Sequence, residues 1–271
     1  MNVISVVCNF DMYNRLVKQN PCFGKNVKFI VWDNNKENKP ISIRYNEFLN
    51  DYDYSNEDWF VFCHEDWELK EKIDSKIESL DKSNIYGPIG MEIGKWWKAP
   101  VCRGRILQSN KDGSNVVQIG EKSNEITEVG TFDCQCIIVH SSLIKKYDLR
   151  FDETLSFDLY VEDFCIQARE KYGIVSKILP LKCQHYSYGN VSKRFYELLK
   201  YMRKKYKKSN RIYYSTVEGE LISCPFPRLA CYFLPRLRNV LRFFYQSKFT
   251  KQNKRLIKIC KIPVYIKGEK E

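Results

Sequence analysis

Trp59-Phe60-Val61-Phe62-Cys63 is a short apolar run that ends directly in the polar triplet His64-Glu65-Asp66. Such a run, bounded by polar residues, is typical of a strand buried on both faces of a sheet. Side chains that follow a strand of this kind lie at the edge of an open α/β sheet, where ligands bind. The sequence therefore predicts a binding site for a charged ligand at this strand end.

Other segments of the chain show the same alternation of strands and helices. We expect strands at 3–8, 27–32, 136–140 and 174–179, and helices near 14–19, 69–82 and 141–146, with a loop that leads into a helix over 157–171. This alternation predicts an α/β fold with a mainly parallel sheet flanked by helices. The segment 85–129 is rich in Gly and polar residues, which favours loops or short strands that carry substrate contacts.

The composition indicates a globular protein with a large core. The chain has 271 residues, of which 44% are hydrophobic. It has no run of 18 apolar residues, and its N-terminus lacks the basic flank and cleavage site of a signal peptide, so we expect a cytoplasmic protein. Its 11 cysteines include no CxxC pair and fit reduced, mostly buried thiols. Cys134 and Cys136 could chelate a metal, but core packing is the favoured interpretation.

The charge is divided unevenly along the chain. Residues 192–271 hold 21 Lys and Arg against 5 Asp and Glu, whereas residues 1–191 hold 24 against 28. We therefore expect an acidic body at 1–191 and a basic, amphipathic helical extension at 192–271, with apolar stripes over 195–206 and 229–244. A basic block of this kind suits an anionic surface, either a membrane leaflet or nucleic acid.

The order of the motifs resembles the family 2 glycosyltransferases of the GT-A fold. The segments that carry this resemblance are Ile4–Asn9, Phe29–Asn34, Phe60–Asp66, Gly130–Cys134, Phe151–Glu153 and Val161–Arg169, and they span roughly residues 3–190. The resemblance implies that residues 1–191 are the catalytic domain of an inverting hexosyltransferase of polysaccharide biosynthesis. Such an enzyme moves a sugar from a nucleoside diphosphate sugar to a hydroxyl of a glycan or lipid-linked acceptor. Two positions depart from the family pattern, since His64-Glu65-Asp66 replaces Asp-x-Asp and Cys134 stands where a Gly is common.

The resemblance also implies a role for each site residue. Asp66 and His185 would hold a divalent cation, Mn²⁺ or Mg²⁺, and an imidazole ligand favours Mn²⁺. Asp163 would be the general base, with Glu162 orienting it or contacting the acceptor. The remaining residues, which would bind the nucleotide sugar, are Asn9, Asp33, Arg44, Asn46, His64, Glu65 and Asp133. Taken singly, these positions also fit helix starts, caps and turns.

Other functional classes are compatible with the sequence. The basic C-terminal region and its tyrosines would suit a nucleic-acid-binding protein, although that interpretation leaves the acidic body unexplained. A carbohydrate-binding GT-A protein without turnover is a third possibility. A nucleotidyltransferase would need a Gly-rich loop with a Lys near the N-terminus, and residues 8–26 show none.

Overall fold

The computed structural model describes residues 1–95, 99–188, 191–217 and 219–222, together with the backbone of strands at 245–249, 255–259 and 262–267. By their internal contacts the residues form two units, Met1–Ser223 and Cys224–Glu271. In the part of the chain that is described, no helix has both the length and the apolar character needed to cross a bilayer.

A seven-stranded sheet organises the first unit, in the order β10-β13-β5-β12-β3-β1-β2. Its strands are β1 (Asn2–Val7), β2 (Lys28–Asp33), β3 (Trp59–Cys63), β5 (Ile85–Gly87), β10 (Thr127–Val129), β12 (Cys136–His140) and β13 (Ser176–Ile178). β1 runs parallel to β2 and β3, and β13 runs parallel to β5. β12 is antiparallel to both β3 and β5, and β10 is antiparallel to β13. The start of β12 therefore lies at the same edge as the carboxyl ends of the parallel strands.

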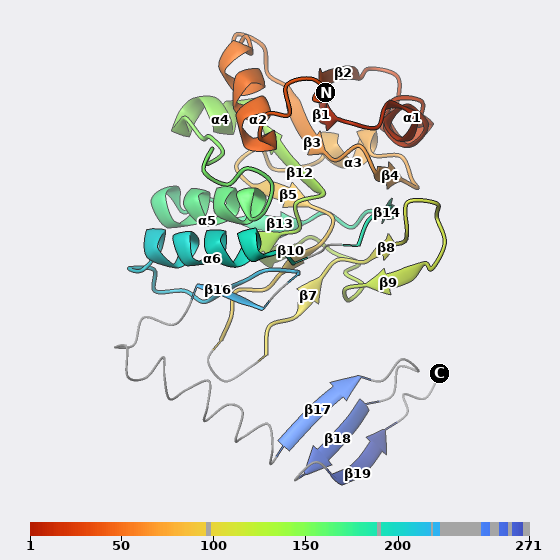
Figure 1. The fold of residues 1–271 in the computed structure, drawn as a ribbon, viewed down its shortest axis with the longest axis vertical. Coiled ribbons are helices and arrows are strands. Elements are labelled where there is room, and N and C mark those ends of the chain that lie inside the picture. Colours follow the sequence, from red (N-terminus) through yellow and green to blue (C-terminus); the bar gives the residue numbers. More distant parts are fainter. Residues whose placement is uncertain are drawn as a thin grey trace. The chain divides into compact units, whose positions relative to one another are not determined.

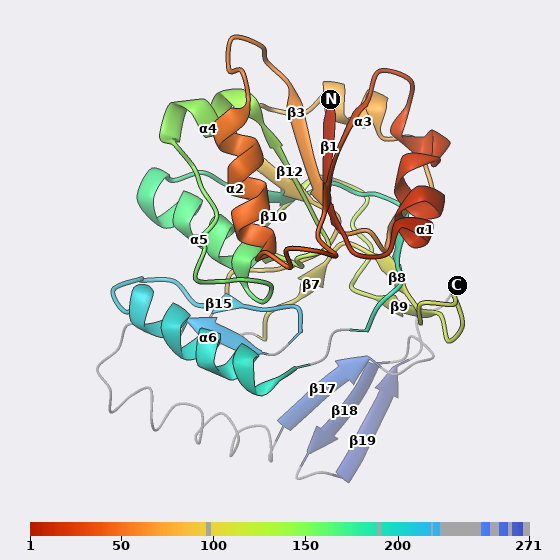
Figure 2. The ribbon, with the colours of Figure 1, turned by 45° about the horizontal axis from the view of Figure 1, so that its top comes forward.

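Helices cover both faces of this sheet (Figures 1 and 2). On one face lie α2 (Ile41–Asp51), α4 (Ser141–Tyr147) and α5 (Tyr160–Tyr172); on the other lie α1 (Phe10–Tyr13), the π-helical η1 (Asn14–Lys18), the 3-10 helix η2 (Pro21–Phe23) and α3 (Asp74–Glu78). β3 shows why both faces are covered. Phe60 and Phe62 pack into the core beneath α2, α4 and α5, whereas Val61 packs into the core on the opposite face. Alternate side chains of a strand point to opposite faces.

Two smaller sheets extend the carboxyl edge of the main sheet. One has the order β11-β6-β7 and the other β4-β14-β8-β9. Their bounds are β4 (Trp67–Leu69), β6 (Gly90–Met91), β7 (Cys102–Arg103), β8 (Ile106–Gln108), β9 (Val117–Ile119), β11 (Thr131–Phe132) and β14 (Cys183–His185). β14 pairs antiparallel with β4, so that His185 lies opposite Trp67. This pairing brings the end of β14 beside the triplet that follows β3.

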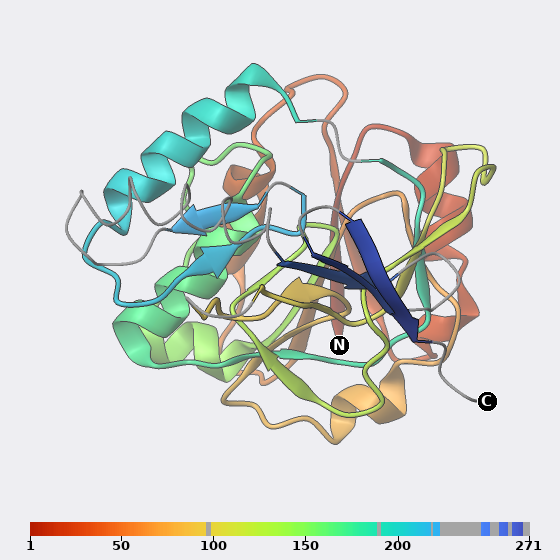
Figure 3. The ribbon, with the colours of Figure 1, turned by 90° about the horizontal axis from the view of Figure 1, so that it is seen from below.

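The first unit closes with α6 (Lys193–Lys205) and a hairpin of β15 (Tyr213–Tyr214) and β16 (Glu220–Ile222). Ser192 caps α6 by accepting a hydrogen bond from the Phe195 amide. The apolar stripe of α6 contributes Phe195, Leu199 and Met202 to the core that α5 also lines. Figure 3 shows the hairpin beside α6. The helix lies in the segment expected to be a C-terminal extension, yet it belongs to the first unit.

The second unit contains an antiparallel sheet of β17 (Tyr245–Phe249), β18 (Arg255–Ile259) and β19 (Ile262–Lys267). The expectation of a helical extension is therefore wrong for these three segments, although it is right for α6. The β-branched residues of β18 and β19, Ile257, Ile259, Ile262, Val264 and Ile266, favour strands. The expected helix at 229–244 lies outside the described residues.

The expected fold class is confirmed: the protein is α/β, with a mixed, mainly parallel sheet flanked by helices. Two local expectations are corrected. The apolar spacing of 69–82 predicted one helix, but only Asp74–Glu78 is helical, because β4 takes the start of that segment into a sheet with β14. The helix α2 was not expected, since its polar and apolar residues give only a weak stripe.

Candidate functional site

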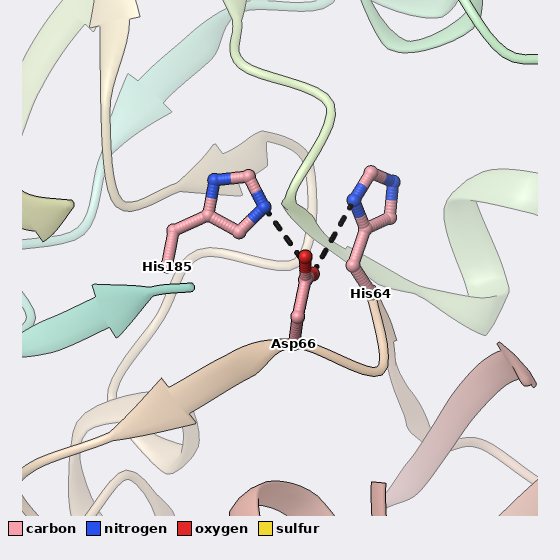
Figure 4. A group of neighbouring side chains, drawn as sticks. All are labelled: His64, Asp66 and His185. Carbon is pink, nitrogen blue, oxygen red and sulfur yellow. Dashed lines mark ion pairs between the residues drawn. The ribbon is translucent and has the colours of Figure 1, made fainter. Parts of the chain in front are cut away.

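Three side chains converge beyond the carboxyl end of β3 (Figure 4). His64 follows β3 directly, Asp66 precedes β4, and His185 ends β14. One ligand atom from each lies within 4.8 Å of the other two. The Asp66 Oδ1 atom lies 3.2 Å from His185 Nε2 and 3.9 Å from His64 Nδ1. Two imidazole nitrogens and a carboxylate oxygen thus surround one point, as they do in many metal sites.

A hydrogen bond to Tyr160 determines the tautomer of the His64 ring, and so whether the nitrogen that faces Asp66 carries a proton or a lone pair. Tyr160 donates its hydroxyl proton to the Cys134 carbonyl oxygen at 2.9 Å. That hydroxyl has one proton, so His64 Nε2, 2.9 Å away, must be the donor to Tyr160. Burial lowers the pKa of His64, which favours the neutral ring, and its Nδ1 is then unprotonated. A lone pair facing a carboxylate oxygen is repulsive unless a cation lies between them.

Asp66 and His185 form an ion pair that is shielded from solvent. Burial alone would raise the pKa of Asp66, but the interaction with His185 and the nearby His64 lower it to about 2. Asp66 Oδ1 and His185 Nε2 are buried and lie 3.2 Å apart, and neither makes a further hydrogen bond with the described residues. Buried polar atoms whose hydrogen-bonding capacity is not filled mark places where an ion or ligand can bind. The donor set and these atoms fit a divalent transition metal such as Mn²⁺.

Asp133 and Gln135 lie next to this group, just before β12. The Gln135 carbonyl oxygen accepts a hydrogen bond from the His64 amide, which joins the start of β12 to the end of β3. Asp133 Oδ1 accepts from the Gln135 amide and from its side-chain nitrogen, each at 3.2 Å. The side-chain oxygen of Gln135 is buried without a partner. Gln135 was not expected from the sequence, because a single Gln after a Cys carries no pattern of its own.

Glu162 is a buried carboxyl in the first turn of α5. Its side chain is 3% exposed; Oε1 accepts a hydrogen bond from the Ser215 hydroxyl at 3.1 Å, and Oε2 has no partner. Burial, with the negative charge of Asp133 nearby, raises the pKa of Glu162 to about 8. A carboxyl with a pKa near the working pH and one free oxygen can accept a proton from a substrate hydroxyl.

Asp163, the next residue, is held in a different environment. It is fully buried, and the Lys205 ammonium lies 2.7 Å from Oδ1 and 2.9 Å from Oδ2. The Tyr206 hydroxyl donates to Oδ1 at 2.7 Å. Burial raises the pKa of Asp163, and Lys205 opposes that rise. Both carboxylate oxygens of Asp163 therefore bond to residues at the end of α6. Of the two acids, Glu162 is the one that lies near Asp133.

The residues expected to meet the nucleotide at the ends of β1 and β2 make local contacts. Glu65 accepts hydrogen bonds from the amides of Cys8 and Asn9 at 2.6 and 2.8 Å, which ties the end of β1 to the triplet. The Asn9 side chain caps α1 by accepting from the Met12 amide. Asp33 accepts from the Asn35 amide in an Asx turn and is exposed. Nucleotide contacts by Asn9 and Asp33 stay predictions.

Arg44 and Asn46 lie on α2 and are buried. The Arg44 guanidinium pairs with Glu37 and Glu47, at 3.0 and 2.9 Å, and lies 5.1 Å from the centre of the Trp32 ring. Asn46 donates to the Phe151 carbonyl oxygen and accepts from the Phe151 amide, both at 2.9 Å. These polar groups are already used by the fold, and neither residue joins the group around Asp66.

An exposed aromatic side chain stands beside the His64 ring. Phe157 is 50% exposed, and its ring is stacked on His64 with centres 5.8 Å apart. Arg194 of α6 lies 5.9 Å from the centre of the Phe157 ring and pairs with Asp158 at 2.9 Å. An aromatic face at the border of a polar site suits the apolar face of a sugar. Phe157 carried no recognisable sequence signal, because its contacts come from distant segments.

Comparisons with known proteins give likenesses in structure alone. No family model matches the chain, and no curated protein matches it. Solved structures that resemble it include GalNAc-T7 with UDP, GalNAc and Mn²⁺, at 9% identity and a TM-score of 0.46 over 76% of this chain and 48% of that one. TarS 1-349 of S. aureus is 13% identical, with a TM-score of 0.46 over 77% and 66%. An inositol-1-phosphate CTP transferase of T. maritima is 14% identical, with a TM-score of 0.34 over 73% and 94%.

This chain thus spans about half of GalNAc-T7 and slightly less than two thirds of the TarS fragment. At these low scores and identities, the likenesses do not bear on substrate or mechanism. The chemistry that this protein can perform has to come from its own site residues.

Proposed function

We propose that this protein is an inverting glycosyltransferase of the GT-A type, which transfers a sugar from a nucleoside diphosphate sugar to a hydroxyl of a glycan or lipid-linked acceptor. The observation that carries the proposal is the gathering of His64, Asp66 and His185 beside Asp133 and Glu162, at the carboxyl edge of the sheet. In the sheet order, β2 and β3 lie on opposite sides of β1, so the topology reverses at β1, where α/β sheets bind ligands.

In this proposal His64, Asp66 and His185 hold a divalent cation. When bound, Mn²⁺ or Mg²⁺ supplies positive charge that stabilises the leaving diphosphate. The chain itself prepares the ligands: Tyr160 holds His64 as the Nε2–H tautomer, and burial keeps that ring neutral. Asp133 would meet the sugar hydroxyls.

We assign the general base to Glu162, in place of the Asp163 that the sequence suggested. Glu162 Oε2 takes the proton of the acceptor hydroxyl while the oxygen of that hydroxyl forms a bond to the anomeric carbon. The bond from the anomeric carbon to the diphosphate breaks, and its electrons leave with the diphosphate. Asp163 lacks a free oxygen for this step, because Lys205 and Tyr206 engage both of its oxygens. We infer that Asp163 fixes the first turn of α5.

A thermal-shift experiment tests the metal and donor together. We expect UDP, GDP, dTDP or CMP to raise the melting temperature in the presence of Mn²⁺ and much less in its absence. Mn²⁺ at 100 times its Kd would stabilise the fold by about 2.7 kcal/mol. Asp66→Asn and His185→Gln should abolish the Mn²⁺ shift. His140→Gln is the matched control, because His140 is buried at the other end of β12 and bonds to Ser142. Equal Mn²⁺ shifts in all three variants would contradict the metal site.

Basic residues on α6 and just after its end support a further part of the proposal, docking on an anionic membrane. Lys200, Lys204, Lys207 and Lys208 are exposed and form no ion pair with the described residues. Each Lys near an anionic leaflet contributes about 1 kcal/mol. Changing these four residues to Gln should weaken sedimentation with phosphatidylserine vesicles at least tenfold. The matched control changes four exposed lysines elsewhere in the first unit, namely Lys25, Lys36, Lys72 and Lys111, and should bind as the wild type does.

A further inference from the structure

The loop of the β15–β16 hairpin reaches the two carboxyls of the proposed site. The hairpin is fixed to the rest of the first unit by backbone contacts: the Thr131 hydroxyl donates to the Tyr214 carbonyl oxygen, and the Gly94 amide donates to the Ile212 carbonyl oxygen. The Ser215 amide donates to the Gly219 carbonyl oxygen and closes the loop. These bonds hold Ser215 and Thr216, two described residues of the loop, next to the main body of the first unit.

Ser215 determines which oxygen of Glu162 stays free. Its hydroxyl oxygen accepts a hydrogen bond from the Val217 amide at 3.1 Å, so its one proton is available to Glu162 Oε1, also at 3.1 Å. Ser215 is 3% exposed, which excludes solvent as a competing partner for that proton. Because Oε1 accepts from Ser215, Oε2 is the oxygen of this carboxyl that has no partner.

Thr216 makes the equivalent contact with the second carboxyl. Its hydroxyl donates to Asp133 Oδ2 at 2.7 Å, while Gln135 supplies two donors to Oδ1. Two consecutive residues of one loop thus bond to two carboxyls that come from different parts of the fold. The strand pairing of the hairpin involves Tyr213 and Tyr214 and uses neither hydroxyl, although the Ser215 oxygen also accepts from the Val217 amide within the loop.

We propose that Ser215 and Thr216 are positioning residues, which set the placement of Glu162 against Asp133 and leave one Glu162 oxygen open to the acceptor hydroxyl. This inference rests on the proposed function and deepens it, because it assigns a part of the site to a segment beyond residue 191. A displacement of about 1 Å in a catalytic group is enough to reduce turnover a hundredfold.

The test measures release of nucleoside diphosphate from UDP-, GDP- and dTDP-sugars with Mn²⁺, with water or added saccharide as the acceptor. Ser215→Ala should lower kcat about tenfold or more and leave the KM for the donor within twofold, because Ser215 has no contact with the metal group. Ser215→Thr keeps the hydroxyl and should restore most of the rate. Thr216→Val and Thr216→Ser form a second pair, in which the first should lower kcat and the second should not.

Ser209→Ala is the matched control, since Ser209 is a buried serine of the same segment whose hydroxyl bonds only to the backbone of Arg211. It should retain wild-type kcat after correction for folded protein. Wild-type turnover with Ser215→Ala as active as Ser209→Ala would overturn the positioning role alone. A wild-type protein that turns over none of the donors would overturn the proposed function, and this inference with it.

Discussion

Two neighbouring acidic residues of α5 face two different regions of the molecule. Their comparison shows how the surroundings of a carboxyl group determine what that group can do. Glu162 faces the carboxyl edge of the sheet, where it is buried beside Asp133 with one hydrogen bond from a neutral hydroxyl. Asp163 faces α6, where it is buried against an ammonium and a phenol. A buried acid that is paired with a counter-charge holds structure together, whereas one without a counter-charge can exchange a proton near neutral pH.

The sharpest way to break this comparison is to remove each acid and measure turnover. Glu162→Gln should reduce donor turnover by about 10²- to 10⁴-fold, because proton transfer by a positioned base contributes that much. Asp163→Asn should reduce it far less per folded molecule. Kinetics corrected for the folded fraction measure this, and a larger specific loss in Asp163→Asn would return the base role to Asp163.

For the free energy of unfolding, we expect the larger loss from the change at Asp163. Asp163→Leu should lower the free energy of unfolding by about 3 kcal/mol, since it removes one partner of a buried ion pair and leaves Lys205 with Asp152 alone. The double change Asp163→Leu with Lys205→Met should recover part of that loss. Urea unfolding measures both. If the single and double variants were equally destabilised, the ion pair would not be the reason for the loss.

The pH dependence of stability should distinguish the two acids as well. Glu162 has a pKa of about 8 in the folded protein, above its ordinary value of 4.5. Between those pH values the folded state keeps a proton that the unfolded chain releases, so the Glu162 contribution to stability falls as pH rises from about 4.5 to about 8. Glu162→Gln should flatten this slope and be more stable than the wild type at pH 8, by at least about 1 kcal/mol. An unchanged slope in urea unfolding would contradict the assignment.

The smallest expected effect concerns Tyr206. Its hydroxyl donates to Asp163 Oδ1, and Tyr206→Phe should cost about 1 kcal/mol of unfolding free energy without lowering kcat. Tyr201→Phe is a suitable comparison, because the Tyr201 hydroxyl donates to Asp152 Oδ2 on the same side of α6. A loss of turnover in Tyr206→Phe would connect the α6 region to the chemistry directly.

The sequence was informative where local pattern and chemistry coincide. A fully apolar run predicted β3, and the polar residues after it lie at the sheet edge as expected. Both acids of the 162–163 pair do lie in the first turn of α5. The sequence did not indicate, however, which of the two acids forms an ion pair. The cation that pairs with Asp163 is Lys205, which lies 42 residues further along the chain.

Other residues were beyond sequence reasoning for related reasons. Arg44 and Asn46 look available in a list of polar residues, but α2 places them against Glu47 and the Phe151 backbone. Ser215 and Thr216 are ordinary turn residues by type, and only the tertiary packing of the hairpin brings them to carboxyls. The strands at 245–249, 255–259 and 262–267 were missed because the apolar stripes expected at 195–206 and 229–244 suggested a helical structure for the whole basic region.

The reversed direction of β10 has a consequence for how such a protein can diversify. Residues 88–126 leave the main sheet after β5 and return to it at β10, and both ends of this excursion lie at the edge that carries the site. Lengthening a loop whose ends are already fixed costs little free energy. Insertions and deletions there can therefore reshape what reaches the site during evolution, while the strands that hold His64, Asp133 and the start of α5 keep their register.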